Sequence, residues 1–255
     1  MKRGAKYLAP KFIWGFSHCG FVGGLRTFHT FCVLDKVGLS IYRKANASKV
    51  GLSMREVVLP KPDLKGSIPL EQTIAARRSQ REFSSKSLTW EQIGQLAWAA
   101  QGQDAHRDPA SREPSRYRTV PSAGATYPLE LFVVTEQGFF RYLPGKHALA
   151  KLTDQDLRGR LAAAAWGQEF IAAAPVTLVF AAEFARTTGR YGERGIRYVY
   201  MEAGHAAQNV HLQAEALGLG SVPVGAFDDA SVGKVLELPS HLEPLYMVPV
   251  GYCPR

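Results

Sequence analysis

The chain has 255 residues, of which 46% are hydrophobic and 21% are charged. This composition is typical of a globular protein with one sizeable core, and no apolar run is long enough to span a bilayer, so a transmembrane segment is excluded. The cysteines Cys19, Cys32 and Cys253 are odd in number and scattered. They indicate no disulfide framework, and we expect a cytoplasmic protein.

The formal net charge of +9 is unevenly distributed along the chain. The first 60 residues contain ten Lys and Arg residues against only Asp35 and Glu56, so they carry eight of the nine net positive charges. The remainder is nearly neutral. We therefore expect no nucleic-acid partner for the remainder of the chain, despite the high isoelectric point.

This asymmetry divides the chain into a basic N-terminal extension, residues 1–56, and a folded domain, residues 57–255. Lys2-Arg3 followed by Phe12 to Leu25 loosely resembles a signal peptide, but His18 and Cys19 interrupt the apolar region and no small-residue cleavage site follows. A membrane-surface arm, a disordered extension and translated upstream sequence with Met54 as the start are all compatible with this segment.

The first two predicted helices lie close together in the sequence. Ser67-Ile68-Pro69 is typical of a helix start, and we expect Leu70 to Arg78 to be helical with Ile74 and Ala75 facing inward. A second helix is expected to begin at Thr89-Trp90-Glu91-Gln92, where Thr and Gln have capping-box spacing, and to end at a left-handed Gly102.

Three arginines, Arg77, Arg78 and Arg81, surround Ser79 at the corner between these helices. A guanidinium presents a planar set of donors that matches phosphate oxygens, so the group predicts an anion clamp for a phosphate ester. An alternative is that the arginines only cover the helix end, where positive charge complements the macrodipole.

The middle of the chain changes from polar loop to small residues. Residues 103–120 are polar and without periodicity, and we expect an exposed loop. Pro121 to Pro128 is a tight segment of mainly small residues, which would let backbone N–H groups approach a flat or anionic ligand.

Strands and helices alternate through the rest of the chain. Their order, with hairpins among the strands, predicts an α+β fold around a mixed sheet. We expect strands at Leu129–Thr135, Phe139–Leu143 (after a turn at 136–138), Val176–Ala182, Val222–Ala226 and Leu245–Val250, and helices at Asp154–Trp166 and Tyr198–Leu217, the latter stopped by Gly218.

Several familiar motifs are excluded. Gly218-x-Gly220 follows a helix, whereas a dinucleotide-binding fingerprint follows a strand. His205 and His211 are six residues apart, so they do not share a helix face as a zinc pair does, and no metal site is expected. We interpret His205 as a packing residue. No nucleophile elbow indicates hydrolysis.

Three motifs, taken together, resemble those of a known family. They are RRSQR at 77–81, PSAGATYPLELFVV at 121–134 and GHAAQNVHLQAEALGLGSVPVGAF at 204–227. In this order they resemble the FMN-dependent nitroreductase superfamily, and within it the SagB-type dehydrogenase-like branch, from about Val57 to Arg255.

The resemblance implies a homodimer of α+β subunits, each with a mixed or antiparallel sheet flanked by helices, and FMN at the subunit interface. Arg77, Arg78, Ser79 and Arg81 would meet the phosphate and ribityl chain. Pro121, Ser122, Ala123 and Gly124 would come from the partner subunit to cover the ring. Gly220, Ser221 and Val222 would present backbone donors near the reactive flavin nitrogen, with Ser221 also assigned to catalysis, and Arg255 matches a basic position that closes on the phosphate.

Tyr191, within the cluster Arg190 to Arg194, is the second candidate catalytic residue. A phenol beside cations is a better proton donor, although the residues slightly favour the alternative, a packed tyrosine in a solvated loop. Relatives that oxidise peptide azolines have a Lys-Tyr pair. If this stretch matches, Arg190 replaces the Lys, and an arginine does not act as a base.

The function expected from these observations is an FMN-dependent oxidoreductase. It would transfer hydride between NAD(P)H or an organic donor and an electron-poor acceptor by a ping-pong mechanism. The alternative is a SagB-like dehydrogenase, or a flavoprotein subunit of a peptide-modifying complex.

Overall fold

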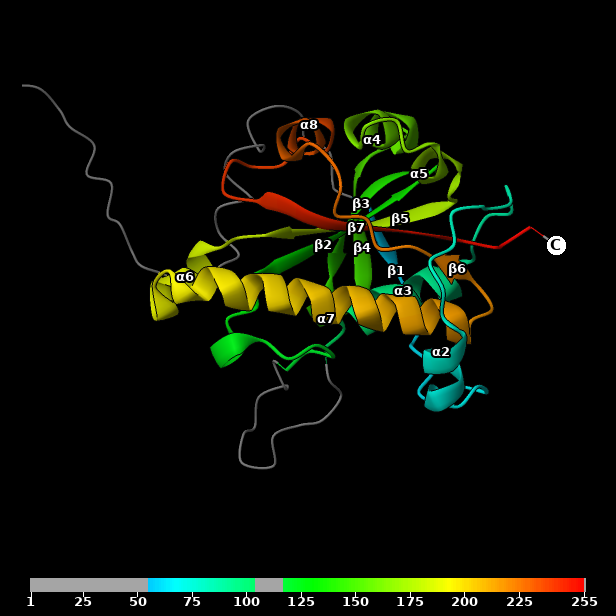
Figure 1. The fold of residues 1–255 in the computed structure, drawn as a ribbon, viewed down its shortest axis with the longest axis horizontal. Coiled ribbons are helices and arrows are strands. Elements are labelled where there is room, and N and C mark those ends of the chain that lie inside the picture. The colour runs from blue at the N-terminus through cyan, green and yellow to red at the C-terminus, as the bar shows by residue number, and fades with distance from the viewer. Residues whose placement is uncertain (1–54, 104–116, 255) are drawn as a thin grey trace, which may run out of the picture. The chain divides into compact units, whose positions relative to one another are not determined.

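The computed structural model describes residues 55–103 and 117–254, and the fold is built on one seven-stranded sheet (Figure 1). Its strand order is β1-β4-β3-β2-β5-β7-β6, and every pair of neighbouring strands is antiparallel. The strands are β1 Glu56–Val58, β2 Leu129–Thr135, β3 Gly138–Leu143, β4 Ala148–Thr153, β5 Val176–Ala182, β6 Gly220–Ser221 and β7 Glu243–Gly251.

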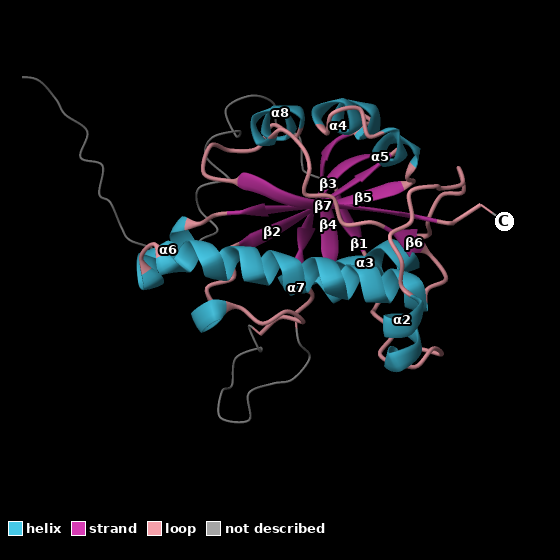
Figure 2. Cartoon of the chain, in the orientation of Figure 1, coloured by secondary structure: helices cyan, strands magenta, loops and turns pink. Residues whose placement is uncertain are grey.

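Helices cover both faces of this sheet (Figure 2). The long helix α7 Arg194–Ala216 lies across one face with α3 Trp90–Gln101 and α2 Leu70–Ala76 packed beside it. The other face carries α4 Arg158–Ala164, α5 Glu169–Ala173 and α8 Asp229–Val235. A short helix, α6 Ala185–Tyr191, precedes α7, and single 3-10 turns occur at η1 Ala123–Ala125 and η2 Pro144–Lys146. The α+β class is thus confirmed, and of the two sheet types expected, mixed or antiparallel, the sheet is antiparallel.

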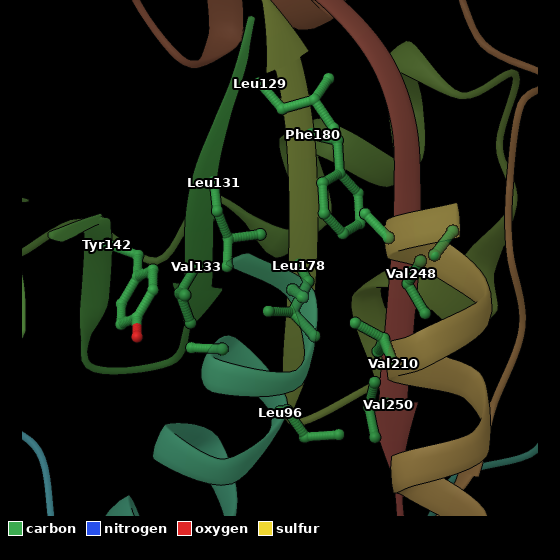
Figure 3. Close-up of a cluster of buried hydrophobic side chains, with 14 of the residues drawn as sticks. Leu96, Leu129, Leu131, Val133, Tyr142, Leu178, Phe180, Val210, Val248 and Val250 are labelled. Carbon is green, nitrogen blue, oxygen red and sulfur yellow. The ribbon is translucent and has the colours of Figure 1, made fainter. Parts of the chain in front are cut away.

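Two hydrophobic cores result, one on each face of the sheet. In β2, Leu129, Leu131 and Val133 face the α3 and α7 side, whereas Phe132 and Val134 face the α4 and α8 side. This alternation follows from the two-residue period of a strand. Figure 3 shows the first core, where Leu96 of α3 and Val210 of α7 pack in the same cluster as side chains of the sheet, such as Phe180 of β5. Because apolar residues along α7 pack in this core, the polar residues of the helix are held in fixed positions relative to the sheet.

Several sequence predictions are confirmed, some to the residue. β2 and β5 have the predicted bounds, and the predicted turn joins β2 to β3 with Thr135 opposite Gly138. The predicted helix at 198–217 is α7, which begins four residues earlier, and Gly218 follows it with a φ of 68°. Short, mainly apolar runs in the strands and the helical spacing of apolar residues in α7 make these elements recognisable from local pattern.

Other predictions were wrong. Ile74 and Ala75 were expected to face inward, but Ile74 is 54% exposed and Ala75 is also exposed. The buried residue of α2 is instead Thr73. Gly102 is extended, with φ −60°, rather than left-handed. Glycine is needed there since a Cβ atom would lie 2.2 Å from Trp98 Cδ1.

Two further elements are shorter than predicted. The helix expected at 154–166 spans only Arg158–Ala164. The strand expected at Val222–Ala226 is replaced by β6 at Gly220–Ser221, after which Val224 makes a single bridge to Met247. The regular strand therefore has two residues, and beyond it only single hydrogen-bonded contacts to β7 continue as far as Val224.

The predicted capping box at the start of α3 is present. Gln92 N donates to Thr89 Oγ1 over 3.3 Å, and Thr89 N donates to Gln92 Oε1 over 3.1 Å. We expect Thr89→Ala to lower the free energy of unfolding by about 1 kcal/mol because a helix N–H loses its acceptor. Thr89→Ser, which keeps the hydroxyl, is the control in urea titrations. Equal losses in both variants would contradict this assignment.

Candidate functional site

The arginine corner, residues 77–81, runs from the end of α2 directly alongside β6. Gln80 N donates to Ser221 O over 3.0 Å, and Ser79 and Ser221 form a parallel bridge. Gly220 permits this approach, since a Cβ atom there would lie 2.8 Å from Gln80 Cβ. The fold thus brings together two of the predicted cofactor-binding segments, which are about 140 residues apart in the sequence.

The three arginines of this corner differ in their contacts. Arg77 Nη1 lies 2.9 Å from His211 Nε2 of α7. Arg78 Nη1 folds back on the end of α2 and donates to the carbonyls of Ala75 and Arg77 over 2.9 and 2.8 Å. The helix-covering alternative therefore describes Arg78 well. Arg81 is exposed and makes no hydrogen bond or ion pair with the described residues, so its guanidinium is available to an anion.

The backbone N–H groups predicted as donors at 220–222 are not all available to a ligand. Val222 N already donates to Pro249 O over 3.2 Å, continuing the pairing of β6 with β7, and the Val222 side chain belongs to the core. Ser221 is 2% exposed, and its hydroxyl is 2.5 Å from His211 Nδ1. Arg255, the remaining predicted phosphate contact, lies outside the described residues.

The second predicted segment, Pro121 to Gly124, lies against Tyr191. Gly124 is left-handed, with φ 61°, and its carbonyl accepts from Arg190 Nη1 over 3.2 Å. A Cβ atom on Gly124 would lie 2.5 Å from the Tyr191 hydroxyl. The Tyr191 ring also packs edge-on against Tyr198 at 5.2 Å between centroids. Tyr191 is therefore packed, and its hydroxyl faces the loop that the resemblance places over the flavin.

A buried polar cluster, here called the Glu202 cluster, lies beneath this loop and consists of Gln101, Arg118, Ser122 and Glu202. Arg118 Nη1 donates to Gln101 Oε1 over 2.7 Å. Glu202 is 3% exposed, and its Oε1 has no hydrogen-bond partner among the described residues. Burial raises the pKa of Glu202 to about 7, while the hydroxyl of Ser122 and the charge of Arg118 pull in the opposite direction. Burial also lowers the pKa of Arg118.

An ion-pair network supports the cluster from the sheet. Glu130 of β2 contacts both Arg141 and Arg186 over 2.8 Å, and Arg186 Nε reaches Glu183 over 2.7 Å. Burial raises the pKa of Glu130, but the two arginines outweigh it and hold this pKa below its ordinary value. Arg186 Nη1 also donates to Tyr127 O, which ties the network to the end of the 121–128 segment.

The predicted site residues therefore form two groups beside different halves of α7. Ser122 lies by Glu202 and Ser221 lies by His211, and these α7 residues are nine positions apart, about 14 Å at 1.5 Å per residue. Tyr191 lies before the first residue of α7, farther still from β6 (Figure 1). Within one chain the two groups do not meet.

His211 and Glu202 were not among the predicted site residues. Both lie on the buried face of α7, together with Val199, Ala203 and Val210. The helical period of these apolar residues was the signal that would have placed a carboxyl and an imidazole facing the core.

The chain is similar to known proteins over most of its folded part. The model of the nitroreductase family matches residues 74–252. The chain belongs to the nitroreductase family. It is 43% identical over 196 residues to a Methanocaldococcus jannaschii protein named as a nitroreductase, covering 74% of this chain and 93% of that protein. A crystal structure named as a nitroreductase from Ralstonia eutropha superposes with a TM-score of 0.68 at 30% identity, covering 81% of this chain and 93% of that chain.

Two shorter matches extend the comparison. A Bacillus subtilis protein named FMN reductase [NAD(P)H] is 31% identical over 113 residues, 39% of this chain and 45% of that protein. The microcin B17-processing protein McbC of Escherichia coli is 29% identical over 132 residues, 48% of each chain. As a nitroreductase-family member, the chain is an oxidoreductase, and the resemblance stated from its motifs is confirmed.

No group of three His, Cys, Asp or Glu side chains suited to a metal ion occurs within residues 55–103 and 117–254. In the same ranges, no helix has both the length and the apolar character needed to cross a membrane.

Proposed function

We propose that this nitroreductase-family protein is an FMN-dependent oxidoreductase whose site is assembled from two copies of the chain. The observation that carries the proposal is the arginine corner held against β6. It combines the exposed guanidinium of Arg81, which has no partner among the described residues, with close backbone approach at Gly220. These features fit a phosphate ester attached to a flat ring. The likeness to a protein named FMN reductase supports this choice of cofactor.

In this proposal each part of the chain has a role. Arg81, with the remaining donors of Arg77 and the Ser79 hydroxyl, would bind the phosphate end. The 121–124 loop of a second copy would cover the ring and exclude water, with Tyr191 beside that loop available to hold or pass a proton. When bound, FMN would supply hydride transfer between NAD(P)H and an electron-poor acceptor in a ping-pong cycle.

The exposed face of α7 supports assembly from two copies. Ile196, Tyr200 and Met201 are 43%, 55% and 52% exposed, and none of the described residues approaches within 4 Å of a Cβ position on Gly204 of the same helix. Two copies packed through this face in antiparallel orientation would bring the 121–124 loop of one toward the arginine corner of the other. That arrangement is isologous, as expected for a homodimer.

We expect Gly204→Arg to convert the dimer to monomer and to lower flavin retention, because a large charged side chain prevents close helix approach. Light scattering after size-exclusion chromatography measures the mass. Gly159→Arg on α4 is the matched control, since it is also an exposed helix glycine with no atom within 4 Å of its Cβ position. A dimeric Gly204→Arg protein would overturn this interface.

The experiment that tests the function is the visible absorbance spectrum of purified protein supplied with FMN, recorded without oxygen before and after adding NADPH. A flavin spectrum that bleaches supports the oxidoreductase with a nicotinamide donor. Failure to retain any flavin contradicts the cofactor assignment.

The match to McbC favours a second candidate, a flavoprotein acting within a peptide-modifying complex. In that case FMN would be retained but would stay oxidised with NADPH and NADH. If the Arg190-Tyr191 stretch matches the Lys-Tyr pair of the azoline-oxidising relatives, Arg190 replaces the Lys, and a peptide dehydrogenase here would need another base.

A further inference from the structure

Three side chains from distant parts of the sequence form a continuous hydrogen-bonded chain behind the arginine corner. Arg77 Nη1 lies 2.9 Å from His211 Nε2, and His211 Nδ1 lies 2.5 Å from Ser221 Oγ. His211 and Ser221 are 3% and 2% exposed. These hydrogen bonds therefore link the end of α2, α7 and β6 through two buried side chains.

The donors and acceptors in this chain follow from Arg77. A guanidinium has no acceptor, so His211 Nε2 must accept the hydrogen bond and carries no proton. In a neutral imidazole the proton then resides on Nδ1, which donates to Ser221 Oγ. Burial, followed by the charge of Arg77, lowers the pKa of His211, so the neutral imidazole is the form favoured at neutral pH.

The same two segments are also joined through the backbone. Ser221 O accepts from Gln80 N over 3.0 Å, and Ser79 bridges to Ser221. Ser221 is thus held at two atoms: its carbonyl accepts from the arginine corner, and its hydroxyl contacts His211 of α7. Loss of the imidazole would leave Arg77 and the buried Ser221 hydroxyl without this shared partner.

We propose that His211 is a positioning residue of the flavin site, which, as its Nδ1–H tautomer, ties Arg77 to Ser221 and holds the arginine corner in register with β6. Its relevance to the flavin rests on the proposed function, whereas the tautomer does not. Arg77 Nη1 is consequently occupied by His211, and only the remaining N–H donors of Arg77 are left for the phosphate.

The tautomer is tested by long-range ¹H–¹⁵N NMR of protein labelled at its histidines, with and without FMN. The His211 signals are assigned by their loss in His211→Asn. We expect the neutral Nδ1–H pattern at pH 7, and a changed pattern in Arg77→Met. An Nε2–H tautomer or a doubly protonated ring at pH 7 would overturn the proposal, whether or not the protein binds FMN.

The positioning role is tested by the dissociation constant for FMN. We expect His211→Leu to raise it about tenfold or more, since the hydrogen bonds on both sides of the ring are lost. His241→Leu, an exposed histidine in the loop before β7, is the matched control. Unchanged affinity in a folded His211→Leu protein would overturn the role.

A double-mutant cycle separates positioning from general damage to packing. If His211 couples Arg77 to Ser221, the effects of Arg77→Met and Ser221→Ala on the FMN dissociation constant should not multiply in the native protein. In the His211→Leu background the coupling is absent, so the two effects should multiply. Multiplicative effects in both backgrounds would contradict coupling through the imidazole. If no variant and no native protein binds FMN, the proposed function fails, and the NMR result still decides the tautomer.

Discussion

Replacing Glu202 by Gln is expected to stabilise the protein at pH 8 by about 3 kcal/mol and at pH 5 by under about 1 kcal/mol. The carboxyl is buried, and its pKa is raised to about 7 from an ordinary value of 4.5. Between these two values the folded state holds a proton that the unfolded state has lost. The free energy of unfolding therefore falls as the pH rises from about 4.5 to 7, and levels off above the folded pKa.

Chemical denaturation at several pH values, at one protein concentration, measures this effect. Glu243→Gln, an exposed glutamate in β7, is the matched control that removes the same charge without relieving burial. The informative quantity is the difference between native protein and variant as a function of pH. A difference that does not change with pH, or a Glu202→Gln protein less stable than native at pH 8, would contradict the raised pKa.

Removing the Arg81 guanidinium is expected to raise the FMN dissociation constant by about 10- to 100-fold, because a charge-assisted hydrogen bond contributes about 1.5–3 kcal/mol. Arg81→Ala should leave the free energy of unfolding nearly unchanged, since this side chain is exposed and makes no hydrogen bond or ion pair with the described residues. Arg81→Lys should be intermediate because an ammonium cannot form a bidentate contact. Quenching of FMN fluorescence measures the dissociation constant.

Two other arginines test whether this effect is specific. Arg160→Ala, an exposed site on α4, removes the same charge on the opposite face of the sheet and should leave the dissociation constant unchanged. Arg78→Ala should have a smaller effect than Arg81→Ala, because Arg78 already donates to the carbonyls at the end of α2. If Arg81→Ala and Arg160→Ala bind FMN equally well, the clamp assignment is wrong.

The part of the fold that could be predicted from sequence is the part set by local pattern. The bounds of β2 and β5 follow from short apolar runs rich in β-branched residues, and the α3 capping box follows from side chains three residues apart. The exposure of Ile74 and the extended Gly102 did not follow, because they depend on the Trp98 ring and on what α2 packs against.

The site divides in the same way. Residue types and order were enough to predict an arginine corner, a small-residue loop and the family they resemble. The contact of Arg77 with His211 joins residues 134 positions apart, and the environment of Glu202 combines parts of α3, α7 and the loop before β2. No local pattern encodes these contacts.

By itself the sequence determined the family, the class of fold and which segments carry the candidate site, since these depend on residue type and on spacing along the chain. The tertiary structure decided which arginine folds back on the end of α2, which side chains contact the two nitrogens of His211, and that the two groups of site residues lie beside different halves of α7. Those properties depend on burial and on hydrogen-bond geometry, which exist only once distant segments have packed together.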